Sequence, residues 1–187
     1  PTRRSSDLDK ICPSGFTAQQ VLLTMAPDKM VGLAQELNDD QLKIFGEKFA
    51  DYPVFGAVLG AKDDLNREAV AAAAPQVIID TGEAKKGAKE DLDALQEQLG
   101  IPVIFIEAKL SDYGAAYERL GELLSMEERG SELSTYCTDV YNKTVTTMEN
   151  IPENERVRMA YLLGDNGLNA IAKTSFQAAV VDMVADN

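Results

Sequence analysis

Short apolar runs alternate along this chain with longer stretches whose apolar residues recur at helical spacing. The runs show little polar alternation, so the strands they predict are covered on both faces, as in a parallel sheet. The predicted strands of this sheet are Lys10–Cys12, Met30–Ala34, Val77–Asp80 and Val103–Ile106. Because parallel strands need helical crossovers, the pattern predicts an α/β fold with a Rossmann-like, mainly parallel sheet.

Start and stop signals mark helices between these runs. In the clearest case Asn66 is a natural N-cap, Glu68 lies in the first turn, and Pro75 ends the helix and favours an extended Ala74. Gly100 suits the residue after another helix. The predicted helices are Phe16–Met25, Asn66–Ala74, Lys85–Leu99, Ser111–Leu124 and Ser175–Val184.

One predicted helix, Ser125–Asn150, is much longer than the others. Ser125 and Glu128 have the spacing of a capping box, and Pro152 follows the end of the helix. The residues expected to face protein are Leu133, Cys137, Val140, Thr144 and Met148. A further strand, Arg156–Leu163, is expected after it. A single Rossmann-like domain does not need so long a helix, whereas two lobes that are held apart by a rigid connector do.

Composition narrows the function classes. The 31 acidic and 18 basic residues give a net charge of −13, which argues against nucleic acid or an anionic membrane as the main partner. The sequence has no histidine, which excludes histidine bases, triads and metal ligands. Cys12 and Cys137 are far apart in the sequence, and a disulfide between them is neither required nor excluded. No apolar run reaches the length of about 18 residues that a membrane span needs.

The segment Asn66–Asp80 resembles a motif of cluster A substrate-binding proteins of ABC importers, which carry ferric siderophores, haem or cobalamin. Asn66, Glu68, Val70, Pro75 and Val77–Ile79 fall in register with that motif without a gap. The order of strands and helices extends the resemblance from about residue 10 to residue 187. The resemblance implies two Rossmann-like lobes, one long connecting helix and a ligand cleft between the lobes.

With this resemblance the chain divides into four parts. Residues 1–8 are expected to be a non-native tail, because Thr2–Leu8 reads as the translation of a sequencing-library adapter. Residues 9–124 are expected to form the N-terminal ligand-binding lobe, 125–151 the connecting helix, and 152–187 the start of a second, incomplete α/β lobe. A signal segment is absent from the sequence, and the resemblance implies an extracytoplasmic protein, periplasmic or lipid-anchored.

Ligands of open α/β sheets bind beyond the carboxyl ends of the strands. The expected ligand-binding residues are Ser14, Gly15, Phe16, Val58, Leu59, Thr81, Gly82, Glu83, Glu107, Asp165 and Asn166. Ser14 either binds an anionic or carbonyl group or only caps a helix. Phe16, Val58 and Leu59 either contact an apolar ligand or only pack within their loops. The resemblance assigns Glu68 to docking on permease arginines, and the alternative is a carboxylate that only favours the helix dipole.

The expected function is therefore that of a non-enzymatic solute-binding component of an ABC importer. Its ligand would be a small-molecule metal complex, an iron–chelate or a corrinoid, and its partner a membrane permease. No cofactor, bound structural metal or nucleic acid is expected. A nucleotide-dependent oxidoreductase on a related scaffold is the alternative, but no G-x-G-x-x-G follows a strand and no G-x-x-x-x-G-K-[ST] is present. A bare zinc or manganese binder is a third possibility, and such proteins generally use histidines.

Overall fold

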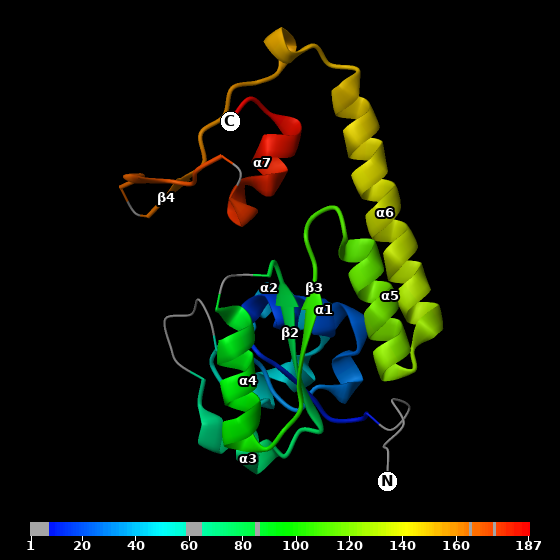
Figure 1. The fold of residues 1–187 in the computed structure, drawn as a ribbon, viewed down its shortest axis with the longest axis vertical. Helices are drawn as coiled ribbons and strands as arrows, with labels where there is room; N and C mark the ends of the chain where they lie inside the picture. Colours follow the sequence, from blue (N-terminus) through cyan, green and yellow to red (C-terminus); the bar gives the residue numbers. More distant parts are fainter. Residues whose placement is uncertain (1–7, 59–64, 85–86, 165, 174) are drawn as a thin grey trace.

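The computed structural model describes residues 8–58, 65–84, 87–164, 166–173 and 175–187. Its strands are β1 (Ile11–Pro13), β2 (Val77–Gly82), β3 (Val103–Glu107), β4 (Leu162–Leu163) and β5 (Asn169–Ala170). Its α-helices are α1 (Phe16–Met25), α2 (Asp39–Phe45), α3 (Arg67–Ala73), α4 (Ala88–Leu99), α5 (Tyr113–Leu124), α6 (Glu127–Glu149) and α7 (Ala179–Val184). We call the described part of residues 8–124 the sheet lobe and that of residues 150–187 the C-terminal segment. The helix α6 rises from the sheet lobe and leads to this segment (Figure 1).

The sheet lobe is built on three parallel strands in the order β1-β2-β3. Ile11 pairs with Val77, and Ile78 pairs with Val103. The α/β class and the parallel pairing of three predicted strands are confirmed, with ends that differ from the prediction by one or two residues. The fold therefore follows from apolar runs that helical crossovers join in parallel.

The predicted strand Met30–Ala34 is wrong as a continuous element. Met30 forms a single parallel bridge with Ile11, and Leu33 forms another with Val54. The chain changes partner between these two bridges, so no two successive residues share a ladder. Gly32 permits the crossing, because a Cβ atom there would lie 2.3 Å from the Phe55 ring.

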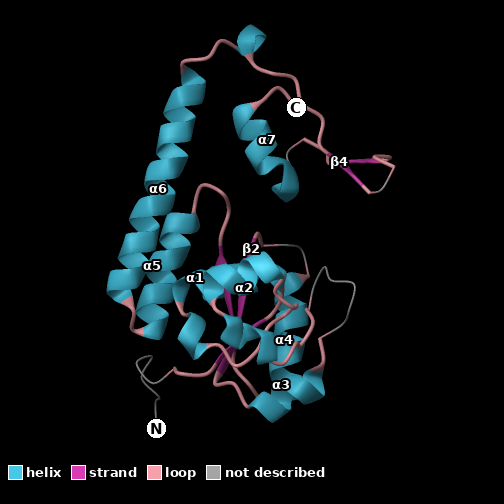
Figure 2. Cartoon of the chain, turned by 180° about the vertical axis from the view of Figure 1, so that it is seen from behind, coloured by secondary structure: helices cyan, strands magenta, loops and turns pink. Residues whose placement is uncertain are grey.

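Helices cover both faces of the sheet, as Figure 2 shows from behind. On β2, Val77 and Ile79 belong to the core with α1, α5 and α6, while Ile78 belongs to a second core with α3 and α4. All three side chains are 0 or 1% exposed. The run without polar alternation therefore has apolar cover on both sides, as its composition predicts.

The helix α3 confirms its predicted start but not its predicted end. Asn66 is the N-cap, and its Oδ1 accepts a hydrogen bond from the Ala69 amide at 3.0 Å. Ala74 was expected to be extended but has φ 48° and ψ 55°. Pro75 disfavours the right-handed helical conformation at the residue before it, and the left-handed one closes the helix instead.

The capping box predicted at Ser125 is wrong. Ser125 is the left-handed residue that ends α5, with φ 53°, and α6 begins only at Glu127. The Met126 amide donates to the Gly121 carbonyl at 2.8 Å, which closes a tight turn between the two helices. The 23 residues of α6 give a length of about 35 Å.

The face of α6 that meets protein differs at one predicted position. Leu133 is buried, and Cys137, Thr144 and Met148 are partly buried. Val140 was expected to face protein, yet it is 49% exposed. The α5 helix covers only the first half of α6 (Figure 1), so helical spacing alone does not bury residues of the second half.

The C-terminal segment holds an antiparallel hairpin, β4 and β5, followed by α7. The predicted strand Arg156–Leu163 is wrong in extent, since only its last two residues form β4. Arg158 forms an isolated parallel bridge with Asp186. A single bridged pair is too short to form a strand. The predicted helix Ser175–Val184 is confirmed, although it starts with a 3-10 turn that Ser175 caps.

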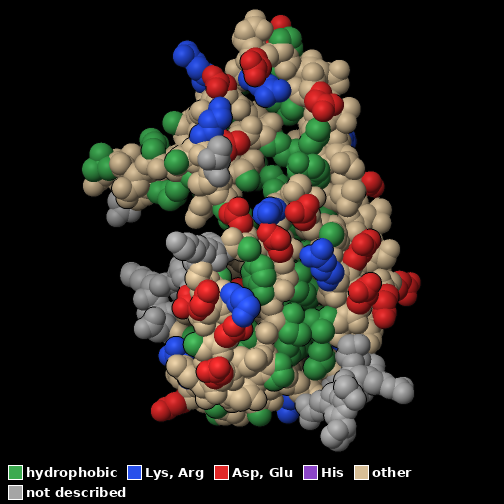
Figure 3. All heavy atoms as spheres, in the orientation of Figure 1, with side chains coloured by type: hydrophobic (Ala, Val, Ile, Leu, Met, Phe, Trp, Pro, Cys, Tyr) green, Lys and Arg blue, Asp and Glu red, His purple; other side chains and the backbone are tan. Residues whose placement is uncertain are grey.

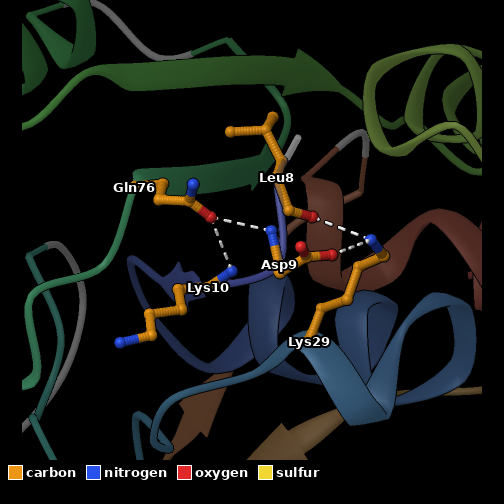
Figure 4. A network of polar contacts seen from close by, with 5 residues as sticks. All are labelled: Leu8, Asp9, Lys10, Lys29 and Gln76. Carbon is orange, nitrogen blue, oxygen red and sulfur yellow. Dashed lines mark hydrogen bonds and ion pairs between the residues drawn. The ribbon is translucent and has the colours of Figure 1, made fainter. Parts of the chain in front are cut away.

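The first described residues are tied into the sheet lobe (Figure 4). The Oε1 atom of Gln76 accepts hydrogen bonds from the amides of Asp9 and Lys10 at 2.7 and 3.0 Å. The Nζ atom of Lys29 donates to the Leu8 carbonyl at 2.8 Å and pairs with Asp9 at 3.0 Å. These contacts fix the entry into β1.

In the part of the chain that the structure describes, every helix is too short or too polar to cross a membrane.

Candidate functional site

Two adjacent hollows lie at the carboxyl ends of the sheet strands. The inner hollow, of about 90 Å³, lies where β1 and β2 run into the loops that follow them. Six of the residues predicted from the sequence line it together: Ser14, Gly15, Phe16, Thr81, Gly82 and Glu83. The sheet brings them together because parallel strands end at the same edge.

Ser14 is held by its neighbours and does not cap α1. Its hydroxyl donates to the Asp80 carboxylate, and its amide donates to the Ile79 carbonyl at 3.0 Å. The N-cap of α1 is Gly15, which provides no side-chain cap. The reading of Ser14 as a helix cap is therefore wrong. The first amides of α1, which line the inner hollow, receive no capping oxygen from the N-cap residue.

Thr81 carries a polar group that the fold leaves unsatisfied. Its side chain is 5% exposed, and its Oγ1 has no hydrogen-bond partner among the described residues. Thr81 also lines the inner hollow. A buried hydroxyl without a partner costs about 1–3 kcal/mol, so a polar ligand atom or a water that reached Thr81 would recover part of that cost.

The outer hollow, of about 430 Å³, separates the sheet lobe from the C-terminal segment. The sheet lobe contributes Glu83 and the loop that contains Lys109. Tyr141 of α6 lies at its side, and Phe176 and α7 form its far wall. Glu83 and Phe176 line both hollows, so the two are adjacent.

Sequence reasoning missed the far wall of this space. Phe176 lies in a 3-10 turn whose local sequence gives no signal for a site. Tyr141 shares the apolar stripe of α6, which is typical of packing. Glu107 is the last residue of β3, and Lys109 follows two residues later. Its position beyond the strand's carboxyl end was the one signal available for Lys109.

Glu83, Lys109 and Asp182 are charged residues that line the outer hollow, whereas Glu107 lies beside it and lines neither hollow. The Glu107 carboxylate pairs with Lys109 at 2.8 Å. This hydrogen bond and the charge of Glu107, with smaller contributions from Asp112 and Glu83, raise the pKa of the Lys109 ammonium. Asp182 of α7 lies on the opposite wall and accepts a hydrogen bond from the Asn187 side chain at 2.7 Å.

The remaining predicted residues lie elsewhere or are not described. Val58 is partly buried, and its amide donates to the Ser14 carbonyl at 2.8 Å beside the inner hollow. Asn166 is exposed in the turn between β4 and β5 and lines neither hollow. Leu59 and Asp165 fall outside the described residues.

Glu68 is exposed in the first turn of α3, as predicted. After α3, Gln76 bonds to the Lys10 carbonyl at the amino end of the sheet, so this helix leads away from the hollows. Within the described ranges, no cluster of three or more histidine, cysteine, aspartate or glutamate side chains has metal-binding geometry.

Comparisons with known proteins show what the fold resembles. The sequence matches no protein-family model and no curated protein. An ABC transporter solute-binding protein from Sulfurospirillum deleyianum is similar in structure, with a TM-score of 0.86 at 22% identity, over 96% of this chain and 56% of that one. The molybdate periplasmic binding protein of Haemophilus influenzae gives 0.64 at 14%, over 82% and 52%. The periplasmic vitamin B12-binding protein of Vibrio cholerae gives 0.63 at 16%, over 85% and 57%.

The chain thus spans little more than half the length of each of these three proteins. Their identities lie well below the level at which function follows from similarity, and what they share with this chain is the path of its strands and helices. The two hollows lie at the carboxyl edge of that common sheet. The chain has the α/β fold of ABC transporter solute-binding proteins.

Proposed function

We propose that this chain is the solute-binding component of an ABC importer and that it acts outside the cytoplasm. Its ligand is a small-molecule metal complex, an iron–chelate or a corrinoid, held in the adjacent inner and outer hollows and delivered to a membrane permease. The observation that carries this proposal is the outer hollow itself, an open hollow between the carboxyl edge of the sheet and the segment that follows α6.

The lining of the hollows combines apolar and polar surface. Phe176 and Tyr141 supply aromatic faces, and Leu110 and Met183 add aliphatic surface. Polar and charged side chains lie among them in similar number, and the inner hollow adds the unpartnered Thr81 hydroxyl. Small-molecule sites typically combine an apolar lining of this kind with a small number of placed polar groups.

The connecting helix supports capture with little movement. One face of α6 packs on α5 across Gly121 and Gly130, and Tyr141 lies farther along the same helix. A continuous helix transmits rotation without bending at a hinge, so we propose that ligand binding closes the two sides of the hollow through small angles only.

Direct binding tests the proposal. Isothermal titration of the chain with a ferric tris-hydroxamate, a ferric tris-catecholate, haem and cyanocobalamin should give saturable binding of at least one complex. Tyr141→Ala and Phe176→Ala should each weaken it by roughly tenfold, as expected for loss of an aromatic contact. Tyr136→Ala is the matched control, because Tyr136 is also on α6 but is 68% exposed and lines neither hollow.

Two results would contradict the proposal. One is that no metal complex binds. The other is that Tyr136→Ala weakens binding as much as Tyr141→Ala, which would remove the outer hollow as the site. Titration with NAD and NADH distinguishes the oxidoreductase alternative, since saturable binding of either cofactor in the same hollow would favour it.

We also propose that Glu68 is a docking residue for the permease. Its exposure in the first turn of α3 leaves the carboxylate accessible to a partner. The helix lies away from the hollows, so docking there does not compete with the ligand. A carboxylate at this place also favours the helix dipole by about 0.3–1 kcal/mol, and the two roles are compatible.

A further inference from the structure

The charged residues of the hollows indicate which kind of ligand the site accepts, an inference that rests on the proposed function. We infer that the ligand is an uncharged or cationic metal complex and that this site discriminates against polyanionic complexes. The inference concerns which member of the proposed ligand class the lining accepts. It is based on the fixed charges beside the hollows. It is also based on the two features that would attract an anion, Lys109 and the amino end of α1, each of which has a carboxylate nearby.

Carboxylates dominate the charged groups around the site. In the described part of the chain, the lining of the two hollows contains Asp80, Glu83 and Asp182, and Lys109 is its one cation. This count leaves out Lys85 and Lys86, which lie outside the described residues. Figure 3 shows acidic side chains gathered around a basic one at the level between the sheet lobe and the C-terminal segment.

Lys109 is already engaged. Its ammonium lies 2.8 Å from the Glu107 carboxylate, and Glu83 and Asp112 add to the negative potential around it. An anionic ligand that approached Lys109 would have to share this cation with Glu107 and to approach Glu83 as well. The lysine therefore neutralises part of the protein's own charge and is a poor receptor for a ligand with several negative charges.

The amino end of α1 is the second feature that would attract an anion. Its first turn, Phe16 to Ala18, lines the inner hollow and has no side-chain cap. Asp80 lines the same hollow, where its carboxylate accepts the Ser14 hydroxyl. A fixed carboxylate near the amino end of a helix offsets the positive end of the helix dipole, which would otherwise favour an anionic ligand.

The unpartnered Thr81 hydroxyl completes the argument. It is neutral and can donate to a carbonyl or hydroxamate oxygen of the ligand or accept from an amide N–H, so it suits these groups of an uncharged complex. Aromatic and aliphatic walls then take up the apolar surface of the ligand. In this lining the neutral contacts favour binding, whereas the fixed charges oppose an anion.

The test compares complexes of different charge on the same chain at low ionic strength. The probes are an uncharged ferric tris-hydroxamate, cyanocobalamin, a ferric tris-catecholate with three negative charges, and molybdate. We expect the tightest binding from an uncharged probe, with the tris-catecholate and molybdate at least roughly tenfold weaker. That ratio should shrink as added salt screens the charges.

A charge-neutralising variant makes the test specific. Glu83→Gln keeps the shape of the side chain and should shift the affinity ratio toward the anionic probes by roughly tenfold. Glu90→Gln removes an exposed carboxylate of α4 outside both hollows and should leave the ratio unchanged. Tightest binding of the tris-catecholate or molybdate would overturn the inference and leave the proposed function standing. Absence of binding by every probe would overturn both.

Discussion

The thiol of Cys12 shows how burial controls chemistry at a single residue. Its side chain is 0% exposed in β1, and this burial raises its pKa from 9.0 to about 12. The thiolate, which is the reactive form, is therefore almost absent at pH 8. We predict that a disulfide-exchange thiol reagent at pH 8 labels Cys137 of the folded chain much faster than Cys12. Both cysteines are free, and burial raises the pKa of the less buried Cys137 as well.

The control for this prediction is Cys137→Ser, which should leave no thiol that reacts before unfolding. The raised pKa also links stability to pH. Above pH 9 the unfolded chain releases the Cys12 proton while the folded chain keeps it, so the free energy of unfolding falls between about pH 9 and 12. Rapid labelling of Cys12 in the folded Cys137→Ser chain would show that β1 opens readily.

On the docking role proposed for Glu68, a substitution there should separate binding of the permease from binding of the ligand. Because it is exposed on α3 and outside both hollows, Glu68→Arg should lower uptake of the bound complex by cells that carry the permease. The affinity of the isolated chain for the complex should stay unchanged. Glu97→Arg, on the exposed face of α4, is the matched charge reversal and should leave uptake intact. A fall in ligand affinity in Glu68→Arg would place Glu68 in the binding site instead.

Between elements, the helices α5 and α6 cross at close range. A Cβ atom at Gly130 would lie 2.7 Å from the Tyr117 carbonyl oxygen and 3.0 Å from the Gly121 Cα. These are backbone atoms and cannot rotate away. We predict that Gly130→Ala destabilises the chain by about 1–3 kcal/mol, because the strain exceeds the gain of about 1 kcal/mol in helix propensity.

Urea denaturation measures this change in the free energy of unfolding. Ser131→Ala is the control, since Ser131 is exposed on the same turn of α6 and its substitution also raises helix propensity while it adds no atom against α5. If Gly130→Ala were as stable as Ser131→Ala, then α5 and α6 would not need their close approach, and the rigidity of the connection would lose its structural basis.

At the scale of the whole molecule, apolar side chains remain exposed on the C-terminal segment. Leu168 is 84% exposed and Leu162 is 52% exposed, both on the hairpin of β4 and β5. A two-stranded hairpin buries little of its own surface and stays marginal in water. We predict that this chain binds an apolar fluorescent dye and self-associates as its concentration rises, as exposed apolar patches do.

Dye fluorescence and light scattering check this prediction. The double variant Leu162→Gln and Leu168→Gln should lower both signals. Ile44→Gln should change neither, although Ile44 is 76% exposed, because it lies on α2 in the sheet lobe. A monomeric chain without dye binding would mean that the hairpin surface needs no cover.

Sequence alone determined the elements whose signals are local. The unbroken apolar run of Val77–Ile79 specified a strand covered on both faces, and Asn66 specified the start of α3 through its own side chain. Six predicted residues also met at one hollow, since the rule that ligands bind beyond parallel strand ends depends only on strand order. Whether these residues bind ligand stays a prediction.

Tertiary structure decided the rest, because its causes lie far apart in the sequence. Ser125 has the spacing of a capping residue, yet the packing of α6 against α5 requires a left-handed turn there. Met30 and Leu33 read as one strand, but each pairs with a different segment. The sequence around Phe176 and Tyr141 does not indicate a binding site. The two residues line the outer hollow because α6 places the C-terminal segment opposite the sheet. Local patterns report forces within a few residues, whereas a hollow is made by surfaces that only the folded chain brings face to face.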